Sequence, residues 1–248
     1  MVDDKQIIEK ARQGFEVGLF TQNYSRIHAD EQHLKMLLSL CPIIKGKHYL
    51  DLGTGNGYIA FSLAQQRRDI SVTGLDIVEK AIEANNRKAE QERYGHLKFK
   101  AYQGQRLPFG EDEFGGVISR YVFHHFPTPT LMAEELARTI EKDGFCIISD
   151  PMPNEGDRVD FINEFAGMKS DGHVRFYGKE EMGRIMFRAG FEVEEQVMSE
   201  ITFPREKTAG YERLVERTPR EILETYDVRV EENLVYVTVA VLNTRFRR

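Results

Sequence analysis

Between residues 47 and 151, short apolar runs alternate with longer segments whose apolar residues recur at helical spacing. Apolar runs bounded by turn residues predict buried strands, and strands that alternate with helices predict a parallel sheet. The expected strands are 48–52, 70–76, 97–102, 116–119 and 145–150, and the expected helices are 59–66, 78–93 and 130–141. Lys142, Asp143 and Gly144 follow the last of these and are typical of a helix end.

The pattern changes on both sides of this region. After residue 151, helical segments at 158–168 and 179–188 precede two long alternating runs at 191–203 and 234–246, which predict two strands that close one edge of the sheet. Before residue 47, apolar residues at helical spacing predict amphipathic helices. These helices form either a lid over a site or ordinary packing, and the pattern does not decide between the two.

Composition narrows the class of protein. The chain has 248 residues, of which 41% are hydrophobic and 30% charged, and this excludes a disordered protein. Its formal net charge of −6 provides no general positive field for nucleic acid or anionic lipid. No run approaches the roughly 20 apolar residues that span a bilayer, and no signal sequence is evident. We therefore expect a cytoplasmic protein with no nucleic-acid partner and no membrane insertion.

A glycine-rich turn carries the chemical information. The strand at 48–52 runs into Gly53, Gly55 and Gly57, where the backbone can approach a ligand closely because no Cβ intervenes. Asp76 ends the next strand, and an acidic group there can accept hydrogen bonds from ribose hydroxyls. A dinucleotide-binding turn would have Gly or Ala at position 58, whereas this chain has Tyr58. Together with Asp51, the turn suits a zwitterionic amino-acid tail better than a pyrophosphate.

Four segments in this order resemble class I S-adenosylmethionine-dependent methyltransferases, in the branch of the ubiquinone/menaquinone-biosynthesis C-methyltransferases. They are Leu50-Asp51-Leu52-Gly53-Thr54-Gly55-Asn56-Gly57, the strand end at Asp76, the stretch from Leu107-Pro108-Phe109 to Arg120-Tyr121-Val122-Phe123-His124-His125-Phe126, and Glu134-Glu135-Leu136 through Asp143-Gly144 to Asp150-Pro151.

The resemblance implies an α/β fold, Rossmann-like and doubly wound, with a mostly parallel seven-stranded sheet, an antiparallel C-terminal edge and an N-terminal helical cap. We expect one domain over 1–248. It would comprise a helical cap over 1–46, a cofactor-binding core over 47–151, and substrate-side helices and C-terminal strands over 152–248.

The resemblance also assigns residues to the cofactor, S-adenosyl-L-methionine. Asp51, Gly53 and Gly55 would line its methionine half, Asp76 would bind its ribose, Ile77 and Gln105 would lie at its adenine, and Arg120 would contribute backbone near the methionine. Thr54 and Asn56 of the same turn are also expected to bind the cofactor. The chain is shorter than similar ones between Gly104 and Leu107, around Gln105. Tyr24 and His28 would share one helical face and close over the cofactor.

The expected reaction is in-line transfer of a methyl group to a small, partly apolar acceptor. The donor is already activated, so much of the catalysis is positioning and exclusion of water, and a base is optional. His124 is the candidate base because it lies one helical turn after Tyr121; the alternative is that His124 and His125 only cap and pack. No residues have metal-ligand spacing.

Two other functions remain possible. The first is a catalytically idle cofactor sensor or scaffold on the same fold, and the second is a nicotinamide-dependent oxidoreductase, which Tyr58 disfavours. The acceptor, the methylated atom and the oligomeric state are open.

Overall fold

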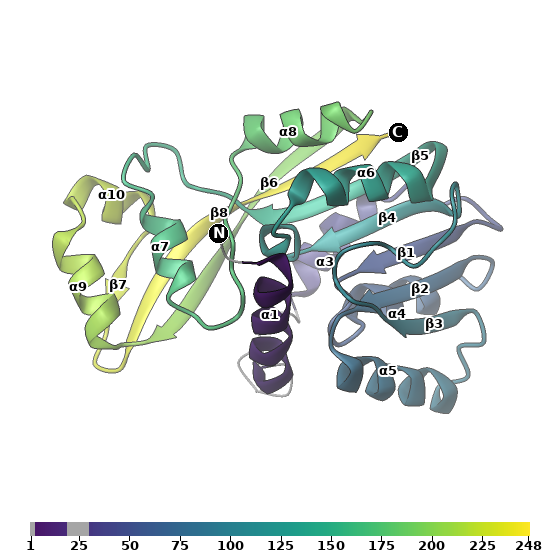
Figure 1. The fold of residues 1–248 in the computed structure, drawn as a ribbon, viewed down its shortest axis with the longest axis horizontal. Helices are drawn as coiled ribbons and strands as arrows, with labels where there is room; N and C mark the ends of the chain where they lie inside the picture. The colour runs from purple at the N-terminus through teal and green to yellow at the C-terminus, as the bar shows by residue number, and fades with distance from the viewer. Residues whose placement is uncertain (1–2, 19–29) are drawn as a thin grey trace.

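A single mixed β-sheet organises the chain in the computed structural model, which describes residues 3–18 and 30–248 (Figure 1). The strand order is β3-β2-β1-β4-β5-β8-β6, and the two-residue strand β7 pairs with β8 off this path. The strands are β1 (His48–Leu52), β2 (Ser71–Asp76), β3 (Leu97–Ala101), β4 (Phe114–Arg120), β5 (Ile140–Pro151), β6 (Glu192–Glu206), β7 (Arg229–Val230) and β8 (Leu234–Arg247). The predicted α/β sheet is confirmed, with short β7 as an additional strand.

Strands β1 to β5 pair in parallel, whereas β8 pairs antiparallel with both β5 and β6. Leu52 at the end of β1 pairs with Leu75 of β2 and with Ser119 of β4. The carboxyl ends of these three strands therefore lie side by side, which is where open α/β sheets bind ligands.

The structure corrects one predicted boundary. Helix α6 (Pro129–Thr139) ends before residue 141, and Gly144 lies inside β5 instead of terminating the helix. The register between β4 and β5 is irregular here, because Phe114 pairs with Ile140 while Gly116 pairs with Phe145. The extra residues include Asp143 at a positive φ, and such a bulge was not evident from the hydrophobic pattern.

Helices cover both faces of the sheet (Figure 1). Apolar residues of α3 (Glu31–Ser39), α4 (Tyr58–Gln66) and α5 (Glu79–Gln91) join one hydrophobic core, and those of α6 and α8 (Lys179–Arg188) join the other. None of the helices described in residues 3–18 and 30–248 is long and apolar enough to cross a membrane.

The far ends of β6 and β8 carry a small lobe, at the left of Figure 1. Helices α7 (Phe161–Gly167), α9 (Ala209–Arg217) and α10 (Arg220–Thr225) pack there against Val235, Val237 and Val239 of β8. The sequence pattern predicted a helix at 158–168 but neither α9 nor α10.

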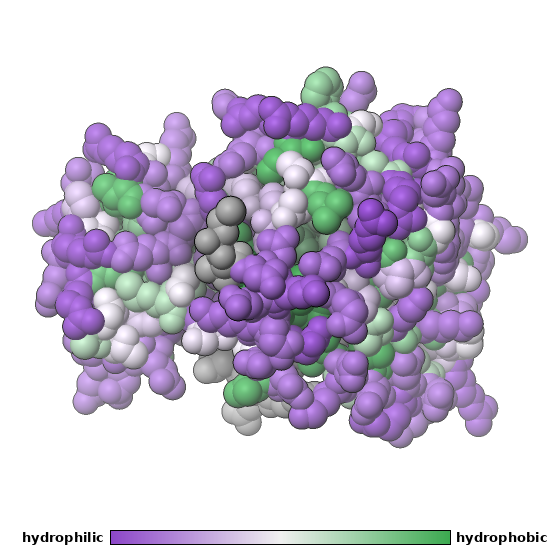
Figure 2. Space-filling view, in the orientation of Figure 1, coloured by the Kyte–Doolittle hydropathy of each residue, from purple (hydrophilic) through white to green (hydrophobic). Residues whose placement is uncertain are grey.

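Helix α1 (Asp4–Gly18) lies between this lobe and the sheet (Figure 1). Its apolar residues Ile8 and Ala11 are buried, whereas the face seen in Figure 2 is mainly hydrophilic where α1 crosses it. Helix α3 begins after Asp30, whose Oδ1 accepts the backbone N–H groups of Gln32 and His33. The predicted N-terminal helices are therefore present. Helix α1 lies beside the small lobe, whereas α3 packs on the sheet with α4 and α5 (Figure 1).

Candidate active site

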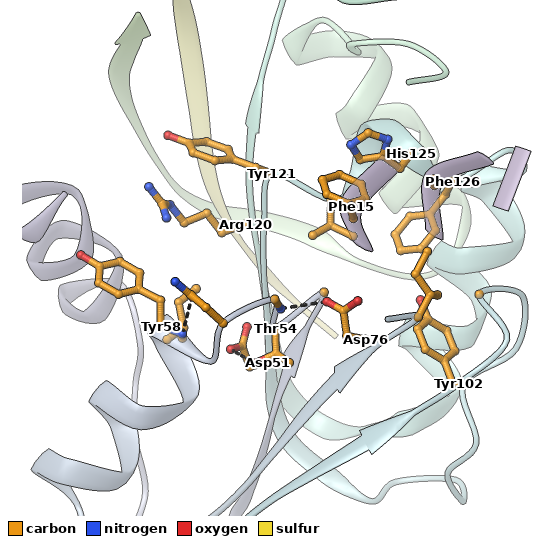
Figure 3. Close-up of a pocket in the computed structure, with 18 of the residues that line it drawn as sticks. Phe15, Asp51, Thr54, Tyr58, Asp76, Tyr102, Arg120, Tyr121, His125 and Phe126 are labelled. Carbon is orange, nitrogen blue, oxygen red and sulfur yellow. Dashed lines mark hydrogen bonds between the residues drawn. The ribbon is translucent and has the colours of Figure 1, made fainter. Parts of the chain in front are cut away.

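A cavity opens at the carboxyl ends of β1, β2 and β4 and is closed on one side by α1 (Figure 3). Its walls come from the glycine-rich loop, the strand ends and α1. The lining residues are Ile8, Ala11, Phe15, Asp51, Gly53, Thr54, Gly55, Asn56, Tyr58, Ile59, Asp76, Ile77, Tyr102, Gly104, Arg120, Tyr121, Val122, His125 and Phe126. Eight predicted site residues are thus brought together in one cavity, and they are Asp51, Gly53, Thr54, Gly55, Asn56, Asp76, Ile77 and Arg120.

The glycine-rich loop is held open by its own backbone conformation. Gly53, Gly55 and Gly57 have φ values of 73°, 51° and 80°, in the left-handed region that favours glycine. A Cβ on Gly53 would also overlap the side chain of Val122. The loop therefore places peptide groups, rather than side chains, against the cavity.

Asp51 stabilises this loop by accepting hydrogen bonds from it and from the helix that follows. Its Oδ2 accepts the Thr54 hydroxyl at 2.7 Å and the Ala60 backbone N–H at 3.0 Å. Burial raises the pKa of Asp51 to about 6, although these two hydrogen bonds oppose the shift. Asp51 therefore acts as a structural acceptor that also faces the cavity.

Asp76 joins the end of β2 to the same loop. Its Oδ2 accepts the Gly55 N–H at 2.8 Å, drawn as a dashed line in Figure 3, and its Oδ1 accepts the Val78 N–H at 3.0 Å. Burial raises the pKa of Asp76 as well. Each carboxylate oxygen keeps acceptor capacity beyond its backbone bond, so Asp76 can still accept hydrogen bonds from a ligand diol.

The other end of the cavity is apolar. Ile77, Tyr102, Gly104 and Phe126 line it together with residues of α1, and these walls suit a flat heterocyclic ring. Gln105 is exposed and does not line the cavity, whereas the adjacent Gly104 does. Tyr24 and His28 lie outside the described residues.

The two histidines after β4 face different surroundings. His124 is buried against Asp150: its Nδ1 lies 2.9 Å from Asp150 Oδ1, and its backbone N–H donates to Oδ2 at 3.0 Å. His124 is not among the lining residues, whereas His125 is. His125 Nδ1 is buried and has no hydrogen-bond partner within residues 3–18 and 30–248. Burial lowers the pKa of both imidazoles to about 3.

The expected alignment of His124 with Tyr121 is not what the structure shows. The short 3-10 helix η1 begins at Phe123 and ends at His125, and Tyr121 precedes it with φ at 59°. The helical geometry assumed between Tyr121 and His124 is therefore absent. Tyr121 faces the cavity, while His124 turns toward Asp150.

Helix α1 docks by a close backbone contact. A Cβ added to Gly172 would come within 2.6 Å of Ala11 Cβ, and a Cβ added to Gly14 would overlap the backbone carbonyl of Ser170. Arg12 Nε donates to the Ile77 carbonyl at 3.2 Å, beside the apolar end of the cavity. The three cavity-lining residues Ile8, Ala11 and Phe15 thus lie on a helix fixed by a loop that is distant in sequence.

We expect hydrogen exchange in α1 to slow when S-adenosylhomocysteine is added. A ligand against Ile8, Ala11 and Phe15 would oppose local opening of the helix, so its amides should gain more protection than global stabilisation provides. Mass spectrometry of exchanged peptides measures this, with α9 in the small lobe as the internal reference. An equal change in α1 and α9 would mean that α1 is permanent packing rather than a cap.

Comparisons with known proteins identify the family. The chain matches the methyltransferase domain family over residues 43–190 and belongs to it. The uncharacterized methyltransferase YcgJ of Bacillus subtilis is 23% identical over 151 residues, which cover 60% of this chain and 59% of that protein. The crystal structure of YcgJ has a TM-score of 0.76 at 17% identity, covering 88% of this chain and 98% of that one, and this likeness shows the fold.

Two further relatives have named activities. The 27-O-demethylrifamycin SV methyltransferase of Amycolatopsis mediterranei is 29% identical over 145 residues, covering 58% of this chain and 50% of that enzyme. The ubiquinone/menaquinone biosynthesis C-methyltransferase of Rickettsia massiliae is 30% identical over 125 residues, covering 48% and 50%. The chain thus spans half to three-fifths of the length of these three curated relatives. Family and fold confirm the predicted class, a class I S-adenosylmethionine-dependent methyltransferase.

The cavity fits the cofactor of this class. It combines a glycine-rich loop, two buried carboxylates and an apolar end, which match an amino-acid tail, a ribose and an adenine in that order. The sequence did not indicate the contributions of Ile8, Ala11, Phe15, Tyr58 and Tyr102. The amphipathic pattern before residue 47 was the signal for the three α1 residues, and only tertiary packing places them at the cavity.

Proposed function

We propose that this protein transfers the methyl group of S-adenosylmethionine to a small, partly apolar acceptor by in-line displacement. The observation that carries the proposal is the juxtaposition of Asp51, the glycine-rich loop and Asp76 in one cavity with an apolar end. When bound, the cofactor supplies an activated methyl group, so the chain's main contribution is to position two molecules and exclude water.

Different residues of the cavity orient the cofactor and exclude water. The loop amides and Asp76 orient the polar half of the cofactor, while Ile77, Tyr102 and Phe126 pack against its ring. Phe15 of α1 and Tyr121 after β4 exclude water from the opposite wall. No residue has to form a covalent intermediate.

A second cavity adjoins the first and is the proposed acceptor site. Arg120 and Tyr121 line both cavities, so a molecule in the second would meet the cofactor beside these two residues. Its other walls combine apolar and charged side chains from Asp30, which caps α3, and from β6, β7 and β8; they include Ile201, Pro204, Arg229, Leu234 and Tyr236. The names of the rifamycin and quinone relatives support an acceptor of this mixed character.

Proton removal from the acceptor, where the reaction needs it, is proposed for the histidine pair. His125 lines the cavity, its Nδ1 has no hydrogen-bond partner among the described residues, and burial lowers its pKa, so the imidazole is neutral at neutral pH. His124, the candidate base from the sequence, does not line the cavity and contacts Asp150 instead, so any part that it takes would be indirect. Both remain proposals, and turnover of His124→Asn and His125→Asn separates them once the acceptor is known.

Methylated products in a host metabolite extract test the proposed function. We expect incubation of the protein with S-adenosylmethionine and extract to yield a new product with one added methyl group and an equal amount of S-adenosylhomocysteine, both followed by mass spectrometry. Binding of S-adenosylhomocysteine without any product would favour the idle cofactor sensor. Binding of a nicotinamide dinucleotide instead would favour the oxidoreductase.

A further inference from the structure

Arg120 is a buried cation that forms no ion pair with the residues that the structure describes. Arg120 is 8% exposed, and no carboxylate within residues 3–18 and 30–248 forms an ion pair with its guanidinium. Its terminal nitrogen Nη2 is buried and has no hydrogen-bond partner in the same part of the chain. Leaving a buried charged donor unpaired is costly, so this position favours an anionic partner that comes from a ligand.

The guanidinium is held in place from behind. Arg120 Nε donates to His33 Nδ1 at 3.1 Å, and His33 Nε2 lies 3.0 Å from Asn243 Oδ1. Because Nδ1 accepts, Nε2 carries the proton and donates to Asn243, so His33 is neutral. Burial and the nearby Arg120 both lower the pKa of His33 and support this state. Residues of α3 and β8 thus fix the orientation of a side chain from β4.

A second unpartnered donor lies beside it. The hydroxyl of Tyr58 is buried and has no hydrogen-bond partner among the described residues, and the Tyr58 ring centre is 5.5 Å from Arg120 Cζ. Burial raises the pKa of Tyr58, so the hydroxyl keeps its proton and can donate. In Figure 3 the Tyr58 ring and the Arg120 side chain lie on the same side of the cavity, and Asp51 lies lower, nearer the centre of the view.

We propose that Arg120 and Tyr58 bind a carboxylate, and that this carboxylate is the one on the amino-acid tail of the cofactor. Two buried donors that line the same cavity, one of them charged, match a carboxylate, and the carboxylate of Asp51 in that cavity complements the ammonium of the tail. This assignment rests on the proposed S-adenosylmethionine site. It adds a side-chain role to Arg120, for which the family resemblance implied only backbone.

An acceptor could also supply a carboxylate, because Arg120 lines the second cavity too. Tyr58 decides between the two sources, since it lines the first cavity and not the second. The geometry therefore favours the cofactor tail, and an experiment can separate the two.

The first test compares two ligands by calorimetry. S-adenosylhomocysteine and its decarboxylated analogue differ only in the carboxylate, so their affinity ratio isolates this subsite. We expect the wild type to prefer S-adenosylhomocysteine by about tenfold or more. In Arg120→Met, the affinities of the two ligands should differ by no more than about threefold. In Tyr58→Phe, which removes only the hydroxyl, the affinity ratio should be several-fold smaller than in the wild type. Arg229→Met, a change confined to the second cavity, should keep the wild-type ratio.

The ratio within each variant cancels general losses of affinity. If Arg120→Met weakens both ligands equally, or keeps the wild-type preference, the assignment is overturned. If neither ligand binds the wild type, the proposed cofactor site fails as well. These two failures are therefore distinguishable.

The second test uses acetate to identify the source of the carboxylate. Acetate should strengthen binding of the decarboxylated analogue to the wild type by occupying the vacated subsite, and it should not do so in Arg120→Met. It should have no effect on the protein saturated with S-adenosylhomocysteine. Acetate binding to that saturated protein, lost in Arg120→Met, would instead assign Arg120 to the acceptor and overturn the proposal for the cofactor tail.

Discussion

Replacing Gly55 with valine will abolish measurable binding of S-adenosylhomocysteine and leave the overall fold intact. Gly55 has φ at 51°, donates its N–H to Asp76 and accepts the side-chain amide of Asn85 with its carbonyl. A β-branched residue is a genuine outlier at this φ, and relaxation of the strain would displace both groups. We expect an affinity loss of about 100-fold or more, because the loop amides and Asp76 would move together.

Thermal unfolding and calorimetric titration measure this prediction separately. The strain should cost about 1–3 kcal/mol, equivalent to a decrease of several degrees in Tm for a chain of this length. Gly95→Val is the matched control, because Gly95 is exposed and a Cβ there meets no atom within 4 Å. Wild-type affinity in Gly55→Val would remove the ligand assignment of this loop.

Replacing Asp76 with alanine will weaken S-adenosylhomocysteine at least tenfold. The change removes acceptors for the ribose hydroxyls, each charge-assisted bond being worth about 1.5–3 kcal/mol before compensation by water. It also releases the Gly55 and Val78 amides that the carboxylate now accepts. Asp76→Asn should keep part of the affinity, because the amide oxygen still accepts while its nitrogen cannot.

The control for this prediction lies at the other end of the same strand. Asp69 precedes β2, is exposed and pairs with Arg67 at the surface, so Asp69→Ala should leave the affinity unchanged. Calorimetry on the four proteins gives the comparison. Equal affinities for the wild type, Asp76→Ala and Asp76→Asn would contradict the ribose role.

The parallel half of the sheet could be predicted because its strands are buried on both faces. Such strands read as continuous apolar runs, and β1 was predicted at its observed bounds. The small lobe could not be predicted in the same way. Helices α9 and α10 are short, and their buried residues Tyr211, Leu214 and Ile222 are separated by charged ones. Helix α9 does have a local signal, because Thr208 caps it and Tyr211 and Leu214 stand at helical spacing, whereas the six-residue α10 depends on packing against its neighbours.

The residues of the candidate site also differ in how far the sequence could predict them. Residues that directly follow a strand, such as Asp51, Asp76 and Arg120, could be placed at the cavity because the sheet brings strand ends together. Residues on α1 and the histidine pair could not. The position of α1 depends on its contact with Gly172, and the direction of His124 depends on the backbone of Tyr121 and η1. Gly104 lines the cavity, whereas the next residue, Gln105, is exposed. A residue in a loop can therefore miss the site even when its immediate neighbour reaches it.

Strand β8 is the common element of two separate hydrophobic cores. Val235 and Val237 pack in the small lobe, while Phe246 near the other end packs under the main sheet. The strand is inserted between β5 and β6, and it pairs Phe145 with the distant Arg247. Neither core is complete until this insertion has occurred, so folding must await a contact of large sequence separation, and both parts should unfold cooperatively. The small lobe is therefore not an exchangeable module, because removing it would also remove a strand that completes the main sheet.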